Sequence, residues 1–329
     1  MVTENRYYLG IDQGYTKTSL ALLSPEKEVI HVDEERTWFD NCSATRRANA
    51  ILLQQRYSER LQKLLGRLQI SVEAPVNVYF STNGDLPEQE VYSLFNQKRL
   101  VVASFEQFSD VHSHYGLTNM PGRCIMYVCG SYYNLMYYDK NNNVTCLQGR
   151  YWDATSWGSG LCAYCLGNFI LDVYAESCLS CSNNQLIRAV ERQLGIMRGN
   201  KTVYDYIQML RLHYDKGCVM KLAQLVSQFI NHPQIARYLE REIEKSLLAV
   251  RLLGEHAGDP DVRTVFLGGG VFTNNEILVD AFKQRAPNIS IECVKGYPAL
   301  GAVYFRLRNP NAEIATWQPK EVTSGNQYK

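Results

Sequence analysis

The sequence predicts an α/β protein whose architecture is duplicated. A set of three short apolar segments, followed by alternating helical and strand-like segments, occurs twice along the chain. A run of three glycines also links an apolar strand to a helix in the last third of the chain, as is common in α/β units. With 329 residues, 46% hydrophobic and 20% charged, the chain can form two domains with sizeable cores.

The first set opens with three predicted strands. The segments RYYLGID, TSLALLS and EVIHV are short and apolar, and Pro25 lies in the turn after the second, which predicts an antiparallel meander. Apolar residues at helical spacing predict a helix over residues 44–68. The strands VNVYFST and RLVVASF, with a short helix after Pro87 between them, complete the first α/β unit.

The second set has the same order, with a longer helical part. Three predicted strands, RCIMYVCG, YNLMYYD and VTCLQGR, are followed by a long helix that begins at Pro233. The strand, glycine turn and helix of VRTVFLGGGVFTNNEILVDAFKQ come next, then the strand ISIECV and a last helix from PALGAVYF. We expect one lobe over residues 1–116, a second over 117–308 with a helical insertion and a final helix that packs back on the first, and a peripheral tail over 309–329.

Charge and hydropathy argue against nucleic-acid and membrane partners. The net charge of +1 gives no overall field that would attract a polyanion. The sequence contains no uninterrupted apolar run of about eighteen residues, and its first ten residues lack the basic and then apolar pattern of an export signal. We therefore expect a cytoplasmic protein.

Ten cysteines are present, and two pairs have the spacing of zinc ligands: Cys162 with Cys165, and Cys178 with Cys181. The apolar periodicity between the pairs predicts a continuous helix, which rises about 1.5 Å per residue and separates the pairs too far for one tetrahedral ion. We expect buried, reduced thiols here. A helix break near Asn168 would leave a zinc site open.

The first predicted hairpin carries polar residues that suit a phosphate chain. In LGIDQGYTKTSL, Gly14 falls in the turn, and Thr16, Lys17 and Thr18 follow it, so backbone N–H groups, hydroxyls and an ammonium group can converge on phosphate oxygens. Asp12 ends the strand, where a carboxylate can face the metal that accompanies phosphates. The alternative is a tight hairpin with a surface acid.

The glycine run is the second candidate. Gly268, Gly269 and Gly270 separate an apolar strand from a helix that has Thr273 near its start. Such a turn lets a ligand approach the backbone and the helix N-terminus. Three motifs follow one another along the chain: the hairpin motif, this glycine run and the helix that begins at Pro298. Their order is a more specific signal than any one of the motifs alone.

That order resembles the N-acetylglucosamine kinase family, one of the BadF/BadG-type ATPases with the fold of actin, hexokinase and the heat-shock ATPases. GIDQGYTKT resembles its first phosphate motif, FLGGGVF its adenosine motif and PALGA its closing helix, over about residues 6–307. The resemblance implies duplicated ribonuclease H-like (actin-like ATPase) lobes with an interlobe cleft for ATP and Mg²⁺. It also implies a small-molecule sugar substrate, and it is compatible with a homodimer.

The resemblance assigns roles to individual residues. Asp110 matches the family's catalytic aspartate at a helix start, a general base that takes the proton from the attacking sugar hydroxyl; a helix cap is the alternative reading. We expect His112 and His114 beside it to pack or to face solvent. The remaining matches are Gly130 and Ser131 for the phosphates, and Asn134, Gly158, Ser159, Asn41 and Asn83 for the sugar, the last two with turn formation as the alternative.

Two motifs depart from the family pattern. Tyr132 replaces the second glycine of the second phosphate motif, and Ser156 and Trp157 replace an acidic pair that helps to hold the sugar. We expect an ATP-dependent kinase that transfers the γ-phosphate to a hydroxyl of an amino sugar or a related sugar. One alternative is a catalytically degenerate nucleotide- or sugar-binding protein of the same fold. Another is an ATPase that activates a redox enzyme through an iron–sulfur cluster, although no cysteine has a setting that clearly matches.

Overall fold

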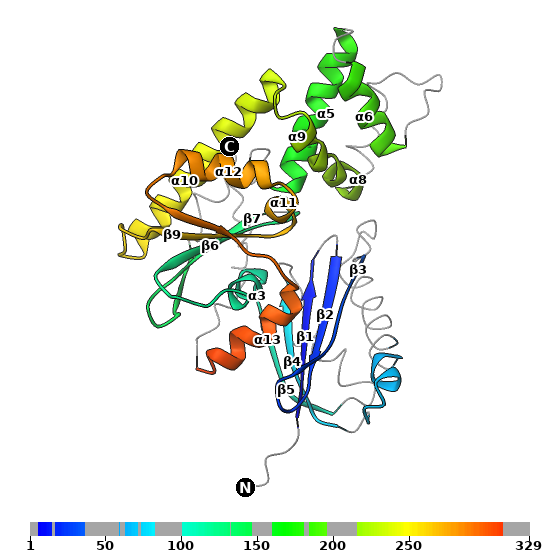
Figure 1. Cartoon of the computed structure of the whole chain (residues 1–329), viewed down its shortest axis with the longest axis vertical. Coiled ribbons are helices and arrows are strands. Elements are labelled where there is room, and N and C mark those ends of the chain that lie inside the picture. The colour runs from blue at the N-terminus through cyan, green and yellow to red at the C-terminus, as the bar shows by residue number, and fades with distance from the viewer. Residues whose placement is uncertain are drawn as a thin grey trace, which may run out of the picture.

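Two five-stranded sheets, one above the other along the long axis, form the frame of the molecule (Figure 1). The structure is a computed structural model. It describes residues 6–14, 17–36, 59, 63–71, 74–82, 101–131, 133–146, 160–180, 184–195 and 216–311.

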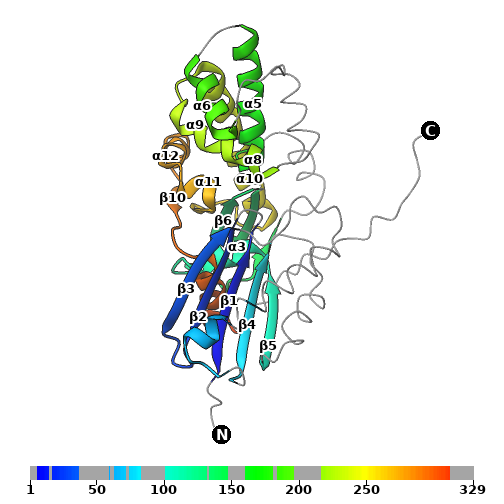
Figure 2. The same cartoon turned by 90° about the vertical axis from the view of Figure 1, so that its right-hand side faces the viewer.

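The first sheet has its strands in the order β3-β2-β1-β4-β5 and is seen face-on in Figure 2. The first three strands form the predicted antiparallel meander, whereas β4 pairs in parallel with β1 and β5 with β4. The strands are β1 (Tyr7–Gln13), β2 (Lys17–Leu23), β3 (Val29–Arg36), β4 (Val76–Thr82) and β5 (Val102–Phe108).

The second sheet repeats this arrangement. Its order is β10-β9-β6-β7-β8, so in both sheets the first strand of the set lies at the centre, with the second and third on one side and the fourth and fifth on the other. The predicted duplication of the α/β fold is therefore confirmed. The strands are β6 (Cys124–Cys129), β7 (Tyr133–Tyr138), β8 (Val144–Thr145), β9 (Thr264–Gly268) and β10 (Ser290–Cys293).

Most described helices belong to the second half of the chain. The helix predicted from Pro233 is present, and the helix between the two cysteine pairs runs through Asn168 without a break. The helices are α3 (Asp110–Gly116), α5 (Ala163–Leu179), α6 (Asn184–Leu194), α8 (Lys216–Lys221), η1 (Leu222–Gln224), α9 (Leu225–Gln228), α10 (Pro233–His256), α11 (Gly270–Thr273), α12 (Glu276–Arg285) and α13 (Pro298–Arg308).

Helices α3 and α13 lie between the two sheets (Figure 1). Helix α3 follows β5 of the first sheet but, apart from α13, packs mainly on β6 of the second. Helix α13 follows β10 of the second sheet and packs on β1, β2 and β4 of the first. Each half of the chain thus completes the core of the other. At the start of α13, the backbone N–H of Ala299 donates to Ser19 Oγ on β2 at 3.2 Å, which pairs one of the N–H groups that a first helical turn leaves unsatisfied.

The two inner helices cross with their backbones in contact. A Cβ on Gly301 of α13 would overlap the carbonyl oxygen of Ser113 on α3, and a Cβ on Gly116 would overlap the carbonyl oxygen of Gly301. Only glycine allows two helix backbones to approach this closely. The crossing therefore depends on both glycines.

Aromatic rings fill the space around this crossing. His112 stacks on Phe305 with ring centroids 4.7 Å apart, and Tyr115 stacks on Tyr138 at 3.7 Å. His112 Nδ1 lies 2.8 Å from the Tyr138 hydroxyl, and burial lowers the pKa of His112 to about 3. The histidine is therefore a neutral packing residue, in agreement with the sequence prediction.

The outer face of the second sheet packs on other helices. Along β6, Ile125 and Tyr127 belong to the large cluster formed with α5, α10 and α12, whereas Met126 and Val128 face α3, as expected from the alternation of side chains in a strand.

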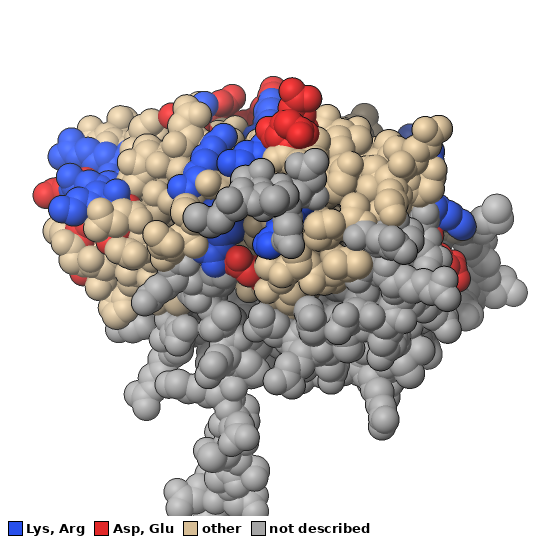
Figure 3. Space-filling model, turned by 90° about the horizontal axis from the view of Figure 1, so that it is seen from below, with Lys and Arg blue, Asp and Glu red and all other residues tan. Residues whose placement is uncertain are grey.

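Among the described helices, none is both long and apolar enough to cross a membrane. On the face seen from below, basic and acidic side chains lie next to each other on the described surface (Figure 3).

Candidate functional site

Two aspartates from different elements approach each other at the end of β1. Asp12 lies opposite Ser81 in the parallel pairing of β1 with β4, and Ser81 Oγ donates to Asp12 Oδ1 at 2.9 Å. Burial and, next, the negative charge of Asp110 at the start of α3 raise the pKa of Asp12 to about 7. Two partly buried carboxylates that repel each other are stabilised when one of them takes up a proton or when a cation binds between them.

This arrangement predicts a stability that depends on pH. Because the folded pKa of Asp12 lies above its ordinary value of 3.8, its contribution to stability is present below about pH 4 and is lost as the pH rises through about 7. A shift of this size corresponds to at most about 4 kcal/mol. Because the side chain of Asp12 is only partly buried, solvent screens its charge, and we expect about 2 kcal/mol. We expect Asp12→Asn to raise the free energy of unfolding at pH 8 by about 2 kcal/mol and to change it little at pH 4.5.

Urea denaturation of both proteins at the two pH values measures this difference. The matched control is Asp280→Asn, which neutralises an exposed carboxylate on α12 and should have little effect at either pH. An Asp12→Asn variant that is equally stable relative to the wild type at both pH values would contradict the assignment.

Asp110 is held by a small network at the start of α3. Ser109 Oγ donates to Asp110 Oδ1 at 3.1 Å and accepts the backbone N–H of Val111 at 3.3 Å, so Ser109 is the helix cap. Asn134 Nδ2, at the start of β7, also donates to Ser109 Oγ, at 3.4 Å. The residue that caps α3 is therefore Ser109 and not Asp110. Asn134 lies close to Asp110, because both side chains bond to Ser109.

The described side chains of the first hairpin bond within the sheet. Lys17 Nζ forms a 2.7 Å ion pair with Glu34 on β3, and the lysine side chain is 59% exposed. The Thr18 hydroxyl is buried and donates to Gln13 Oε1 at 3.0 Å, while the N–H of Gly14 donates to the carbonyl of Lys17 at 2.9 Å. A phosphate would have to compete with these partners.

The segment of Gly130 and Ser131 is bonded to the start of α5. The carbonyl oxygen of Gly130 accepts the N–H of Ala163 at 2.9 Å, and that of Ser131 accepts the N–H of Tyr164 at 3.3 Å. A Cβ added at Gly130 would meet open space. The remaining sequence-predicted residues of the site, and the substituted motif positions, lie outside the described residues: Thr16, Asn41, Asn83, Tyr132, Ser156, Trp157, Gly158 and Ser159.

The three glycines at the end of β9 and directly after it have different surroundings. Gly269 has a φ of 88°, and a Cβ there would lie 2.5 Å from the carbonyl oxygen of Cys129 at the end of β6. A Cβ on Gly268 would lie 2.7 Å from the ring of His114, whereas a Cβ on Gly270 would meet only Asn274 at 3.7 Å. The first two glycines therefore allow the strand end to pack on β6 and α3, whereas a side chain at the third would meet only an ordinary contact with Asn274.

Two residues that the sequence analysis did not assign to the site contact it. His114 Nδ1 lies 2.9 Å from the carbonyl oxygen of Asp110; because a carbonyl only accepts, Nδ1 carries the proton, and burial lowers the pKa of this histidine. Its ring also packs on Gly268, so His114 joins the first turn of α3 to the glycine run. Ser81 is the other residue. The i, i+4 spacing from Asp110 could have indicated His114, whereas Ser81 belongs to no motif.

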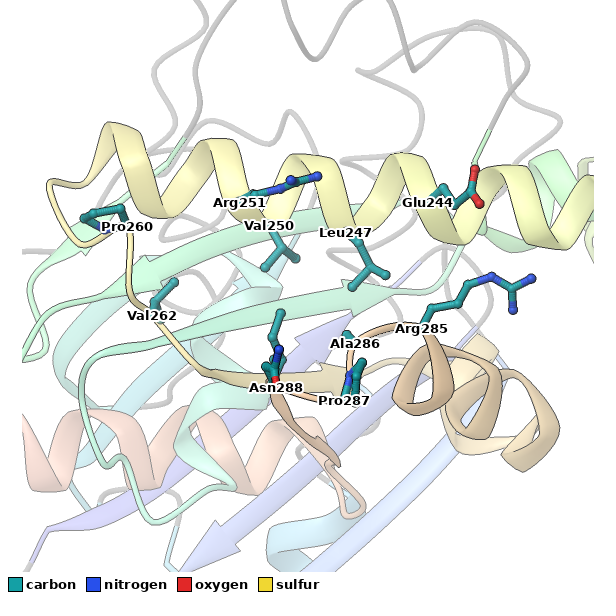
Figure 4. A pocket seen from close by; sticks show the side chains of 11 residues that line it. Glu244, Leu247, Val250, Arg251, Pro260, Val262, Arg285, Ala286, Pro287 and Asn288 are labelled. Atoms are coloured by element: carbon teal, nitrogen blue, oxygen red, sulfur yellow. The ribbon is translucent and has the colours of Figure 1, made fainter.

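A separate pocket of about 590 Å³ lies between α10 and the segment that joins α12 to β10 (Figure 4). Leu247, Val250 and Val262 form its apolar lining, and Arg251 and Arg285 contribute the basic groups. No sequence-predicted site residue lines it.

Comparison with known proteins identifies the fold. No protein-family model and no curated protein matches the chain. Two crystal structures provisionally assigned as N-acetylglucosamine kinases match over 92% of this chain and 99% of theirs: one from Chromobacterium violaceum, with a TM-score of 0.68 and 16% identity, and one from Porphyromonas gingivalis, with 0.68 and 14%. A ROK family glucokinase from Streptomyces griseus, in complex with glucose and AMPPNP, matches with a TM-score of 0.53 and 12% identity, over 91% of this chain and 97% of its own.

The chain therefore has the two-lobed actin-like ATPase fold that the sequence predicts. Within this fold it is more similar to the two assigned N-acetylglucosamine kinases than to the glucokinase, with TM-scores of 0.68 against 0.53. At these identities the likeness concerns the fold, and activity has to be argued from the site.

Proposed function

We propose that this protein is an ATP-dependent sugar kinase that transfers the γ-phosphate of ATP to a hydroxyl of an amino sugar or a related sugar. The observation that carries the proposal is the pair of aspartates, Asp12 and Asp110, at the end of β1 and the start of α3. The fold supports it, because a glucokinase of this fold was crystallised with a sugar and an ATP analogue.

In this proposal Asp110 acts as the general base. Its carboxylate accepts the proton of the sugar hydroxyl as the oxygen attacks the γ-phosphorus. The hydrogen bond from Ser109 to Asp110 Oδ1 orients the carboxylate. Asn134, whose amide donates to Ser109 Oγ, is proposed to contact the sugar, and the proposed contacts of Asn41, Asn83, Gly158 and Ser159 would complete its binding.

Asp12 has a separate role in the proposal, as the residue that holds Mg²⁺. Its raised pKa fits this role, because a cation would relieve the repulsion between the two carboxylates. When bound, Mg²⁺ neutralises charge on the phosphates and the transferred group. The segments Gly130–Ser131 and Gly268–Gly270 are proposed to contact the phosphates and the adenosine, with open space beside Gly130.

The alternative is a protein that keeps the fold and the nucleotide but does not transfer phosphate. The observation that favours it lies in the first hairpin, where Lys17 forms an ion pair with Glu34 and the Thr18 hydroxyl donates to Gln13. The substitution of glycine by Tyr132 in the second phosphate motif points the same way.

The experiment that separates the two measures ADP release from Mg-ATP with hexoses, hexosamines and N-acetylated hexosamines, each compared with no sugar. We expect one class of amino sugar to stimulate ADP release at least tenfold, with a phosphorylated sugar as the product by mass spectrometry. Calorimetric binding of ATP without product across the panel would favour the binding protein. Absence of ATP binding would overturn both.

A further inference from the structure

Three cysteine thiols gather where β6 and α5 meet, next to Gly130. Cys162 is the N-cap residue of α5, Cys165 lies in the first turn of that helix, and Cys129 is the last residue of β6. All three are buried, with exposed fractions of 1%, 4% and 0%. They belong to one hydrophobic cluster, and the N–H of Ala163, next to Cys162, donates to the carbonyl oxygen of Gly130, next to Cys129, at 2.9 Å.

The backbone at Cys162 and Cys165 suits a disulfide. A cap residue and the residue three positions further on have Cα atoms about 5–6 Å apart, within the range that a disulfide spans. The thiol of Cys165 influences the pKa of the Cys162 thiol as a hydrogen-bond donor would. Bond formation therefore requires a local adjustment of the first turn of α5, where Ala163 and Tyr164 lie.

The two thiols differ in acidity in the way that a dithiol reaction needs. Donation from the Cys165 thiol, together with the backbone N–H groups of Tyr164 and Cys165, lowers the pKa of Cys162 in spite of its burial. The same hydrogen bond, with burial, raises the pKa of Cys165. A thiolate at a helix N-terminus is the usual nucleophile in Cys-X-X-Cys motifs.

We propose that Cys162 and Cys165 are a peroxide-reactive dithiol that closes to a disulfide. Because the sulfur of Cys162 is almost fully covered, the oxidant must be as small as hydrogen peroxide. The Cys162 thiolate attacks one peroxide oxygen and breaks the O–O bond, which gives a sulfenic acid and hydroxide. The Cys165 sulfur then attacks the sulfenic sulfur, and its proton and the sulfenic OH leave as water. In total, two thiols and one peroxide give one disulfide and two waters. The inference does not depend on the proposed kinase activity.

The reaction would act on the neighbouring loop. The N–H groups of Ala163 and Tyr164, which lie between the two cysteines, donate to the carbonyl oxygens of Gly130 and Ser131. A new covalent bond across this turn changes the orientation of those N–H groups. Oxidation should therefore loosen the attachment of the 130–131 segment to α5.

The test treats the native protein with increasing hydrogen peroxide, removes the peroxide with catalase, and alkylates the remaining thiols under denaturing conditions. Chymotrypsin cleaves after Tyr164 and so places Cys162 and Cys165 on separate peptides, which remain joined only if a disulfide links them. We expect this linked pair to form at lower peroxide than any oxidation of the partly exposed Cys146, Cys178, Cys218 and Cys293, and dithiothreitol to reverse it.

Two variants sharpen the result. Cys165→Ser should stop at the sulfenic acid of Cys162, which dimedone traps, whereas Cys178→Ser, at the other end of the same helix, should form the disulfide as the wild type does. Full alkylation of Cys162 and Cys165 after the partly exposed cysteines are oxidised would overturn the proposal, as would a link from Cys162 to Cys129. Mapping in the wild type decides the matter even if a variant does not fold.

Hydrogen exchange of the Ala163 and Tyr164 amides tests the effect on the loop. Their exchange should become at least tenfold faster after oxidation and return to its original rate after reduction. Unchanged exchange in the disulfide form would overturn the coupling to the 130–131 segment.

Discussion

Asp110→Asn is expected to lower sugar-dependent turnover by about 10²–10⁴-fold, the usual contribution of a general base. Asparagine has nearly the same shape and can still accept the hydrogen bond from Ser109, so the start of α3 should keep its structure. What the substitution removes is the ability to take a proton. The measurement is kcat/KM for the best sugar of the panel, with ATP binding determined in parallel by calorimetry.

The control for this experiment is Asp280→Asn, which removes one negative charge from an exposed position on α12 and should leave turnover within twofold. A second readout follows from the pair of aspartates. Because the charge of Asp110 raises the pKa of Asp12, Asp110→Asn should also weaken the fall in stability between pH 4 and pH 7. Turnover within tenfold of the wild type in Asp110→Asn would contradict the role of base.

Gly301→Ala is expected to reduce the free energy of unfolding by about 3 kcal/mol or more, at the upper end for overpacked cores. The added methyl group would overlap the carbonyl oxygen of Ser113 and lie 2.8 Å from Leu117 Cγ. Since the first obstacle is backbone, no change of rotamer relieves it. Helices α3 and α13 would have to separate, which would also open the stack of His112 on Phe305. Urea denaturation, followed by circular dichroism, measures the loss.

The matched control is Gly66→Ala, in the helical segment 63–67, where an added Cβ meets nothing within 4 Å. There alanine should leave stability unchanged or raise it by up to about 1 kcal/mol, because alanine has the higher helix propensity. If Gly301→Ala lay within about 1 kcal/mol of the wild type, the two backbones would not be in contact as described.

Local patterns in the sequence were sufficient to predict the first strands and the long helix α10. Short apolar segments with turn residues between them predicted the meander of β1 to β3, and the three-to-four-residue periodicity predicted α10. The order of strands within each sheet depends on parallel pairs between segments far apart in the chain, and so does the crossing of Gly116 with Gly301. No local pattern carries that information. The resemblance to a known family supplied only the two duplicated lobes, and the strand order and the glycine crossing became visible in the structure.

The candidate site also contains residues that the sequence could indicate and others that it could not. Motif matches singled out Asp12 and Asp110, but their mutual repulsion became visible only in three dimensions. Ser81 could not be found, because a serine at a strand end has no distinctive neighbours and acquires its partner through the register of β1 with β4. The engagement of Lys17 was also hidden, since Glu34 reaches it from the next strand of the sheet.

The exchange of inner helices between the two halves affects how the protein can be made on the ribosome. The first sheet is complete once β5 has emerged, yet the helix that covers its inner face, α13, is translated nearly 200 residues later, after roughly 10–40 s at ordinary rates of synthesis. During that interval Ala21, Leu23 and Tyr79, which α13 finally buries, stay uncovered on the nascent chain. Folding of the amino-terminal half is therefore a late event, and a chaperone that shields this sheet until translation ends would increase the yield of native protein.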